Sequence, residues 1–141
     1  MIPPPGGFQL RVGLAQFKPK KADVASNLSR IRDVTCEQAG AVDLLVFPEA
    51  SVTGYFLEGG VAEAARSATD IAKGLGEPPV AAPDVVLGFF ERDRRRLYNS
   101  VVYLTPGEGG FKATHVHRKM FLPTYGVFDE ARFVEAGKSV Q

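Results

Sequence analysis

Val42-Asp43-Leu44-Leu45-Val46-Phe47-Pro48-Glu49 is the stretch of sequence that decides the fold. Its apolar run, residues 44–47, contains no alternating polar residue, which predicts a short strand buried on both faces. Pro48 ends this strand, because proline has no N–H to donate to a sheet ladder. Such a strand is typical of an α/β layered domain, in which helices cover a central sheet.

The residues before this stretch predict one more strand and a helix. Residues 10–17 alternate apolar side chains on one face and read as a strand, and residues 23–39 read as a helix. Asp23 is the expected N-cap and Gly40 the expected stop. The core-facing stripe of this helix is expected to comprise Val24, Leu28, Ile31 and Thr35.

The residues after this stretch predict a helix and an antiparallel hairpin. A helix is expected over 61–75, followed by a buried strand at 84–90 and a charged turn at 92–96. Two strands, 97–104 and 111–117, flank a Pro/Gly-rich turn and read as a hairpin. The order β-α-β-α-β-β-β predicts a mixed sheet, with an irregular stretch at 118–141.

Composition excludes several classes of function. The 141 residues suit one globular domain, and 17 Lys+Arg against 16 Asp+Glu leave a net charge of +1, which gives no electrostatic case for a nucleic-acid partner or an anionic membrane surface. No apolar stretch reaches the roughly 18 residues that a membrane span needs. Residues 1–9 read as a flexible tail without signal-peptide features. The single cysteine, Cys36, predicts no internal disulfide and a reducing, cytoplasmic setting.

Two charged side chains follow predicted strands, where α/β sheets place their ligands. Glu49 lies among apolar neighbours that are expected to desolvate it, as suits a general base; the alternative is a solvated glutamate at a strand end. Lys119 ends the last strand before an apolar run, and its ammonium can stabilise an oxyanion in a cleft; the alternative is a basic strand end that faces water.

Other chemistry-bearing residues give weaker signals. Glu130 is expected either to hold Lys119 or to form a surface turn in which an acid pairs with Arg132. His115 and His117 lack an identifiable third ligand, so no metal is predicted. Cys36 lies inside the first helix and reads as a small apolar filler rather than a nucleophile.

A set of short motifs, in order from Arg11 to about Gly137, resembles the nitrilase superfamily of carbon–nitrogen hydrolases. The form Gly-Val-Phe-Asp-Glu at 126–130 looks most like amidases and the glutamine-hydrolysing domain of NAD synthetases. The matching segments are Val-Gly-Leu-Ala-Gln at 12–16, Asn27, Phe-Pro-Glu at 47–49, Thr-Gly-Tyr at 53–55, Tyr-Asn-Ser at 98–100, Arg-Lys at 118–119, Leu-Pro-Thr-Tyr at 122–125 and Phe-Asp-Glu at 128–130.

The resemblance implies roles for individual residues. The family uses a Glu-Lys-Cys triad, in which Glu49 matches the general base, Lys119 the lysine that stabilises the tetrahedral intermediate and Glu130 a supporting glutamate. Tyr55 is expected to contact the substrate, a small amide or nitrile. The family's cysteine lies some tens of residues beyond the lysine, so this sequence contains no matching nucleophile and is expected to be inactive by itself. No metal or organic cofactor is implied.

The resemblance also implies an architecture. Residues 10–141 are expected to be the N-terminal half of a four-layer α-β-β-α sandwich, which leaves the inner face of their sheet uncovered. Such a chain is expected to form a homo-oligomer or to associate with a missing C-terminal half. Two other interpretations stay open: a non-catalytic half-domain or relic that binds a partner through this face, and a generic α/β ligand-binding domain whose Glu49 and Lys119 lie far apart.

Overall fold

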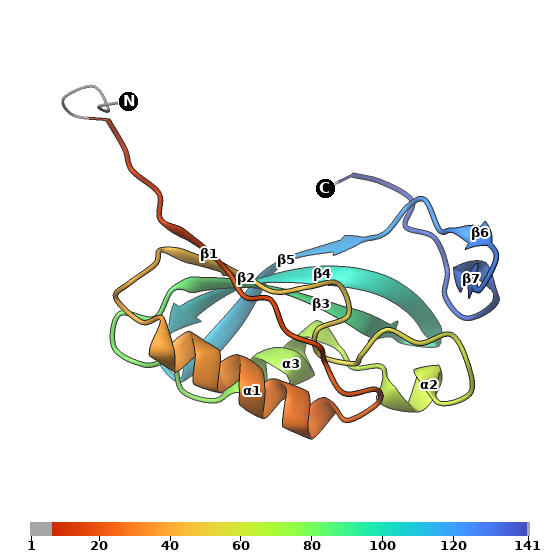
Figure 1. The fold of residues 1–141 in the computed structure, drawn as a ribbon, viewed down its shortest axis with the longest axis horizontal. Coiled ribbons are helices and arrows are strands. Elements are labelled where there is room, and N and C mark those ends of the chain that lie inside the picture. Colours follow the sequence, from red (N-terminus) through yellow and green to blue (C-terminus); the bar gives the residue numbers. More distant parts are fainter. Residues whose placement is uncertain (1–6, 141) are drawn as a thin grey trace.

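The computed structural model describes residues 7–140, in which helices cover one face of a five-stranded sheet (Figure 1). The strands are β1 (Val12–Leu14), β2 (Leu44–Val46), β3 (Asp84–Asp93), β4 (Arg96–Gly107) and β5 (Gly110–Arg118). The helices are α1 (Val24–Glu37), α2 (Val61–Ala64) and α3 (Ala68–Leu75). A separate hairpin of β6 (Thr124–Tyr125) and β7 (Phe128–Asp129) precedes the 3₁₀-helix η1 (Glu130–Arg132).

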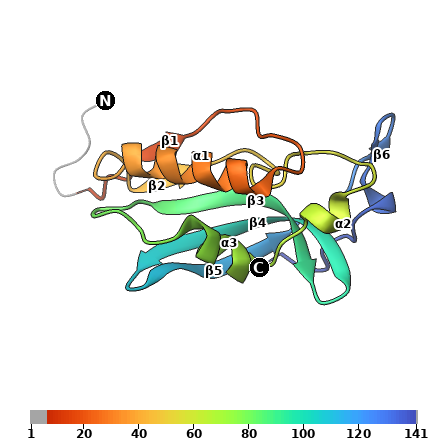
Figure 2. The same ribbon diagram turned by 90° about the horizontal axis from the view of Figure 1, so that it is seen from below.

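The strand order explains why the helices share one face. β1, β2 and β3 are parallel neighbours in chain order, and β4 and β5 add antiparallel partners, so the predicted mixed sheet is confirmed. Parallel strands are joined by right-handed crossovers, and successive crossovers in one direction place their helices on the same side. From the helix side, α1 lies by β1 and β2, and α3 lies over β5 (Figure 2).

The core lies between this helical layer and the sheet. Alternate side chains of β3 and β4 point toward α1 and α3, because successive residues of a strand face opposite sides. The largest of the fully buried apolar side chains in this layer are Ile31, Leu45, Val52, Ile71, Leu75, Val85, Leu87, Phe89, Val102 and Leu104. A smaller cluster around Phe90 packs beneath α2 and the segment that precedes it.

The opposite face of the sheet carries apolar side chains with no layer above them in the described residues. The side chain of Leu14 is 79% exposed and that of Val12 is 48% exposed. On β2, Leu45 is buried but its neighbours Leu44 and Val46 are only half-buried. The prediction that this strand is buried on both faces is therefore wrong for the described chain, because helices cover one side alone.

The single helix predicted over 61–75 is wrong: the structure has two helices, α2 and α3. Between them Arg66 is extended, and its backbone bonds to the flank of β3, accepting from Arg92 N at 2.9 Å and donating to Phe90 O at 3.1 Å. Ser67 then caps α3 by accepting from Asp70 N at 3.1 Å. The two hydrogen bonds to β3 outweigh the helix-forming tendency of this alanine-rich segment.

Helix α1 begins as predicted and ends two residues early. Asp23 caps it by accepting from Ser26 N at 3.1 Å, which confirms the expected N-cap. The helix ends at Glu37, and Gly40 lies beyond the cap with a positive φ of 74°. Cys36 is exposed, so its predicted role as an apolar filler is wrong. It lies on the solvent side of the helix, next to the buried Thr35.

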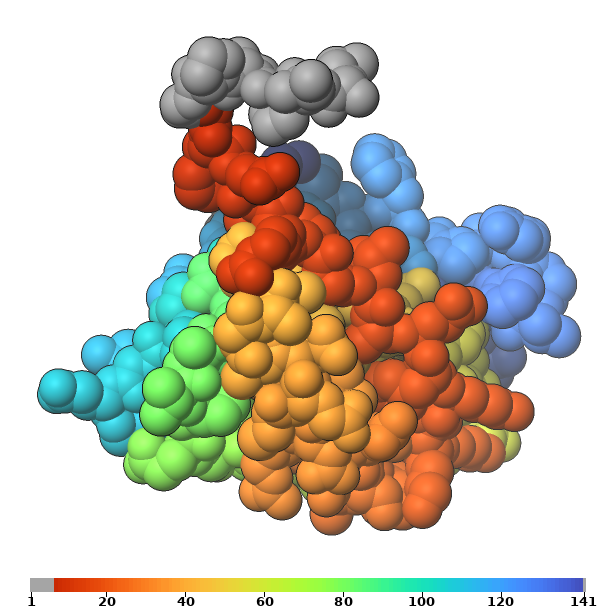
Figure 3. All heavy atoms as spheres, turned by 60° about the vertical axis from the view of Figure 1, so that its left-hand side comes forward, coloured from red at the N-terminus to blue at the C-terminus, as the bar shows by residue number. Residues whose placement is uncertain are grey.

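The observed strands begin and end at residues other than the predicted ones. The first strand is shorter than predicted, whereas β3 and β4 extend to a tight turn at Arg94-Arg95. That turn and the one between β4 and β5 project from the body; Figure 3 shows the latter in cyan, opposite the blue segment that carries β6 and β7. The tail predicted at 1–9 falls largely outside the described residues. No helix in residues 7–140 has the length and apolar character needed to cross a membrane.

Candidate functional site

Glu49 lies in a loop that folds back over β3. After β2 ends at Val46, residues 48–54 cross the middle of the neighbouring strand β3, and Val52 N donates to Gly88 O at 3.1 Å. A Cβ on Gly88 would lie 2.5 Å from Ala50 N, so only glycine lets the loop approach this closely. Sequence reasoning missed Gly88, although a glycine inside an apolar strand is the usual signal of such an approach.

Asn27 ties the same loop to the start of α1. Its side chain accepts from Lys20 N at 2.8 Å, and it donates to Lys20 O at 2.7 Å and Val52 O at 2.9 Å. The residue is buried, and its amide therefore satisfies backbone groups of two loops at once. Asn27 positions the segment that carries Glu49 without touching the site itself.

Lys119 directly follows β5, and Arg118 anchors it. The Arg118 guanidinium donates to buried Glu91 at 2.8 and 2.7 Å and to Asp93 at 2.7 Å, and it stacks on the Tyr98 ring at 4.0 Å. The hydrogen bonds to Glu91 raise the pKa of Arg118. Successive residues of an extended chain point to opposite sides, so the Lys119 side chain points away from the side on which Arg118 is held.

The ammonium of Lys119 bridges two carboxylates. Its Nζ lies 2.9 Å from Glu49 Oε1 and 2.9 Å from Glu130 Oε1, so the structure brings Lys119 together with acids 70 and 11 positions away in the sequence. The Glu130 side chain is fully buried, that of Lys119 is 32% exposed and that of Glu49 is 54% exposed. The expected desolvation of Glu49 is therefore wrong for this chain: Glu130 is the carboxylate removed from water.

Glu130 is surrounded by hydrogen-bond donors. Besides Lys119, it accepts from Tyr55 Oη at 2.7 Å and from Asn99 Nδ2 at 3.4 Å. Burial, and next the hydrogen bond to Glu130, raise the pKa of the Tyr55 phenol, which therefore stays a proton donor. The expected surface-turn pairing involves Asp129, which lies 3.8 Å from Arg132. The predicted contact of Tyr55 with a substrate stays a prediction.

Asn99 contributes a contact that the sequence did not indicate. From β4 its Nδ2 donates to Glu49 Oε1 at 2.7 Å, the same oxygen that accepts from Lys119. The Tyr-Asn-Ser motif at 98–100 was the only signal for this residue, and no charge or spacing rule points to a neutral amide between two carboxylates. Asn99 and Tyr55 thus complete the shell of donors around the two acids.

The charge state of Lys119 determines what the cluster can do. Burial opposes its positive charge, but the hydrogen bonds to Glu49 and Glu130 outweigh that effect and raise its pKa. Lys119 is therefore an ammonium at neutral pH, suited to stabilise negative charge rather than to accept a proton. Glu49 has the exposure that a proton acceptor needs.

A cavity of about 490 Å³ opens beside Glu49 and Lys119. Most of its wall is apolar, which would favour the uncharged part of a small ligand. Its lining comes from the segment after β2, from β3, β4 and the end of β5, and from the residues after β5: Phe47, Pro48, Glu49, Gly88, Asn99, Ser100, Val101, His117, Lys119, Met120, Phe121 and Val140. A reacting group in this cavity can reach both charged side chains.

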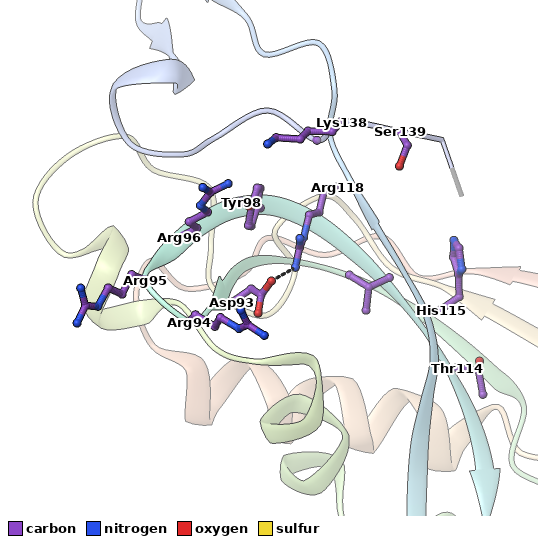
Figure 4. Close-up of a pocket in the computed structure, with 12 residues that line it drawn as sticks. Asp93, Arg94, Arg95, Arg96, Tyr98, Thr114, His115, Arg118, Lys138 and Ser139 are labelled. Carbon is purple, nitrogen blue, oxygen red and sulfur yellow. Dashed lines mark hydrogen bonds and ion pairs between the residues drawn. The ribbon is translucent and has the colours of Figure 1, made fainter.

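A second, larger cavity of about 930 Å³ lies around Arg118 and the turn between β3 and β4 (Figure 4). Its charged lining is mainly basic, and in Figure 4 Arg118 points toward Asp93. None of the predicted catalytic residues lines it. His115 lines this cavity whereas His117 lines the other, and within residues 7–140 no group of three His, Cys, Asp or Glu side chains is placed to hold a metal ion.

Sequence comparisons relate the chain to one family of hydrolases. A profile described as carbon–nitrogen hydrolase matches residues 11–141. A glutamine-dependent NAD(+) synthetase of Thermotoga maritima is 32% identical over 137 residues, and an (R)-stereoselective amidase of Pseudomonas sp. is 37% identical over 117 residues. These matches cover 94% and 76% of this chain but only 23% and 40% of the relatives, so the chain spans less than half the length of either.

Solved structures show the same fold. Glutamine-dependent NAD+ synthetase from Acinetobacter baumannii superimposes with a TM-score of 0.73 at 28% identity, over 92% of this chain and 24% of that one. A CN-hydrolase superfamily protein from Xanthomonas campestris gives a TM-score of 0.69 at 22% identity, over 92% of this chain and 47% of that one. The mixed sheet with its helices thus corresponds to part of a larger fold.

Proposed function

Because the chain belongs to the carbon–nitrogen hydrolase family, we propose that it provides the base and the lysine of an amidase- or nitrilase-type active site. The observation that carries this proposal is the position of Lys119 Nζ, 2.9 Å from an oxygen of each of Glu49 and Glu130. A generic ligand-binding domain with coincidental motifs would not be expected to bring these residues together. The proposed substrate is a small amide or nitrile.

In the proposed reaction on an amide, Glu49 accepts the proton of a cysteine thiol, and the thiolate attacks the carbonyl carbon. Lys119, together with a backbone N–H, stabilises the negative charge that develops on the oxygen. The amine leaves with a proton from Glu49, and water, activated by the same carboxylate, then hydrolyses the thioester. These steps need only protein groups and water.

Exposure divides the two glutamates between two roles. Glu49 is 54% exposed and lines the cavity, so a proton can reach it. Glu130 is fully buried and is occupied by Lys119, Tyr55 and Asn99. Glu130 therefore suits the supporting role, in which it holds the ammonium of Lys119 and keeps its charge.

The nucleophile is proposed to come from polypeptide other than residues 1–141. Cys36 is the one cysteine of the sequence, and it lies exposed on α1, in the helical layer. The cavity beside Glu49 and Lys119 is lined instead by β4 and the segments after β2 and β5. The chain by itself is accordingly proposed to be inactive, and its free exposed thiol is compatible with the proposed cytoplasmic setting.

Ammonia release from small amides and nitriles tests the proposal. The 141-residue chain and any longer product of its reading frame are assayed in parallel, each with and without a thiol-alkylating reagent. We expect turnover in the longer product alone, sensitive to alkylation, retained in Cys36→Ser and lost in Glu49→Gln and Lys119→Ala. Turnover that depends on Cys36, or that survives both site substitutions, would place the active site elsewhere.

A second candidate function is supported by the uncovered sheet face. Leu14 and Val12 are 79% and 48% exposed there, which suits a non-catalytic half-domain that binds a partner. The same face is also where a C-terminal half or a second copy of the chain is proposed to associate. The non-catalytic function would be favoured if the chain formed stable complexes and none of them hydrolysed an amide.

A further inference from the structure

Asn99 on β4 contacts all three charged residues of the site. Its backbone oxygen accepts from Lys119 N at 2.8 Å, and its side-chain Nδ2 donates to Glu49 Oε1 at 2.7 Å and to Glu130 Oε2 at 3.4 Å. The residue is only 3% exposed, so these contacts replace water rather than compete with it. Asn99 thus links the chain segments that carry Glu49, Lys119 and Glu130.

The chemistry of the site favours an amide at this position. Two carboxylates share one ammonium, which leaves a net charge of −1 and repulsion between the acids. A carboxamide nitrogen has two N–H donors and no charge, so it can serve both acids at once. A second cation would weaken the base, a third acid would increase the repulsion, and an apolar side chain would leave buried oxygens with fewer donors.

The contacts also select one oxygen of Glu49. Lys119 and Asn99 both donate to Oε1, and among the described residues no hydrogen bond reaches Oε2. Two donors on one oxygen fix the rotation of the carboxylate, and the second oxygen stays available for a proton. The neighbouring Ser100 points the other way and donates to Glu91 at 2.6 Å, so β4 serves the site on one face and the Arg118 anchor on the other.

We infer that Asn99 is a positioning residue, which fixes Glu49 through Oε1 and leaves Oε2 as the oxygen that takes the proton of the nucleophile. The inference deepens the proposed function and rests on it for the identity of the base. The contacts behind it, a neutral amide shared between two carboxylates beside Lys119, can be measured without turnover.

The sequence offers an internal control for that measurement. Asn27 and Asn99 are its two asparagines, and the Asn27 amide donates to backbone carbonyls alone. In the full chain labelled with ¹⁵N-asparagine, we expect the Asn99 side-chain protons to move upfield as acid protonates the carboxylates, while those of Asn27 stay in place. Glu49→Gln should reduce the Asn99 shift. An Asn99 amide as insensitive to pH as that of Asn27 would overturn the inference.

An isosteric substitution separates positioning from packing. Asn99→Asp keeps the shape of the side chain but adds a carboxylate, so the Lys119 ammonium should titrate at a higher pH than in the wild type. The titration is followed in ¹³C-lysine spectra, and the Lys119 signal is assigned by its loss in Lys119→Arg. Thr105→Ala, also on β4 but lining neither cavity, should leave that titration unchanged. The Asn27 amide position reports that each variant is folded. A Lys119 titration that does not move in folded Asn99→Asp would contradict the inference.

The results for Asn99 and the test of the proposed function can disagree, and each disagreement has its own meaning. If the amide and lysine titrations behave as expected but no assembled form hydrolyses an amide, the contacts stand and the hydrolase assignment is wrong. If turnover depends on Glu49 and Lys119 while the Asn99 amide ignores pH, the site is an active site and the positioning role of Asn99 is wrong.

Discussion

At the scale of single residues, the site is a balance of charge and burial. A fully buried carboxylate is unfavourable unless several donors satisfy it, and Glu130 has three: an ammonium, a phenol and an amide. Glu49 keeps access to solvent and shares the same ammonium. The two acids therefore differ in accessibility although both bind Lys119, and this difference supports the roles proposed for them.

Removal of the ammonium tests this balance as a function of pH. Lys119→Met leaves Glu130 buried beside fewer donors and should lower the free energy of unfolding by about 3 kcal/mol at pH 7. The folded-state pKa of Lys119 is raised above its ordinary value of 10.5, so its stabilisation is complete below that value and is lost as the pH rises through the folded-state pKa. Urea unfolding at a series of pH values should show the difference between wild type and variant narrowing above about pH 10.5. If the stability difference between wild type and Lys119→Met widened above that pH, the positive charge assigned to Lys119 would be contradicted.

The phenol of Tyr55 makes a separate contribution. Tyr55→Phe removes one donor from buried Glu130 and should lower the free energy of unfolding by about 1.5–3 kcal/mol, as for a hydrogen bond to a charged group. Tyr125→Phe is the matched control, because Tyr125 is 72% exposed, and it should change stability by less than about 0.5 kcal/mol. Equal effects of the two substitutions in urea unfolding would show that the bond to Glu130 contributes nothing.

At the scale of elements, the position of Glu49 depends on how its loop lies on β3. Residues 48–54 are held by hydrogen bonds from Val52 N to Gly88 O and from Phe90 N to Thr53 Oγ1, each 3.1 Å long. Ala50 in this loop adopts a positive φ of 51°, a conformation that costs energy for a residue with a Cβ. The bonds to β3 hold the loop in this conformation, directly beside Glu49.

A methyl group on Gly88 should displace the loop. Gly88→Ala brings a Cβ to 2.5 Å from Ala50 N and 2.8 Å from Glu49 Cα, so backbone must move, at an expected cost of about 1–3 kcal/mol. Gly59→Ala is the control, since nothing lies within 4 Å of its added Cβ. Urea unfolding measures the loss, and the Asn99 side-chain amide shift reports the departure of Glu49. If Gly88→Ala kept both the wild-type stability and the wild-type Asn99 amide shift, the close approach of the loop to Gly88 would be refuted.

At the scale of the whole molecule, one topological fact determines the exposed surface. The parallel strands β1, β2 and β3 follow one another in one direction, so their helical connections lie on one side and the other side stays bare (Figure 1). That side carries Val12, Leu14 and the half-buried Leu44 and Val46. Large contiguous apolar patches are uncommon on soluble monomers, so this face is proposed to be an interface.

Self-association of the chain should therefore depend on this face. In sedimentation velocity the 15.2-kDa chain is expected to sediment above its monomer mass, and Leu14→Glu should shift it toward the monomer. Val80→Glu provides the comparison, because Val80 is 94% exposed in the loop between α3 and β3. A wild-type chain that stays monomeric at every concentration would remove the case for an interface on the bare sheet.

Local signals in the sequence predicted much of the fold, whereas the charged residues of the candidate site were named by their resemblance to the family's motifs. Asp23 capped α1 as expected, and the apolar strands formed a mixed sheet, because caps and hydrophobic periodicity act over a few residues. The break at Arg66 and the exposure of Cys36 were missed, because the first depends on hydrogen bonds to β3 and the second on which side of α1 meets the core.

The sequence by itself determined the family and the residue types of the site, since Glu49, Lys119 and Glu130 each lie in a short ordered motif. Only the tertiary structure decided which acid is buried, which amide bridges the acids and which glycine admits the loop. Glu130, Asn99 and Gly88 acquire these roles from neighbours distant in sequence: the donors to Glu130 lie 11, 31 and 75 positions away, and Asn99 lies 50 positions from Glu49. Burial and hydrogen bonding depend on such distant neighbours, whereas motifs and periodicity do not.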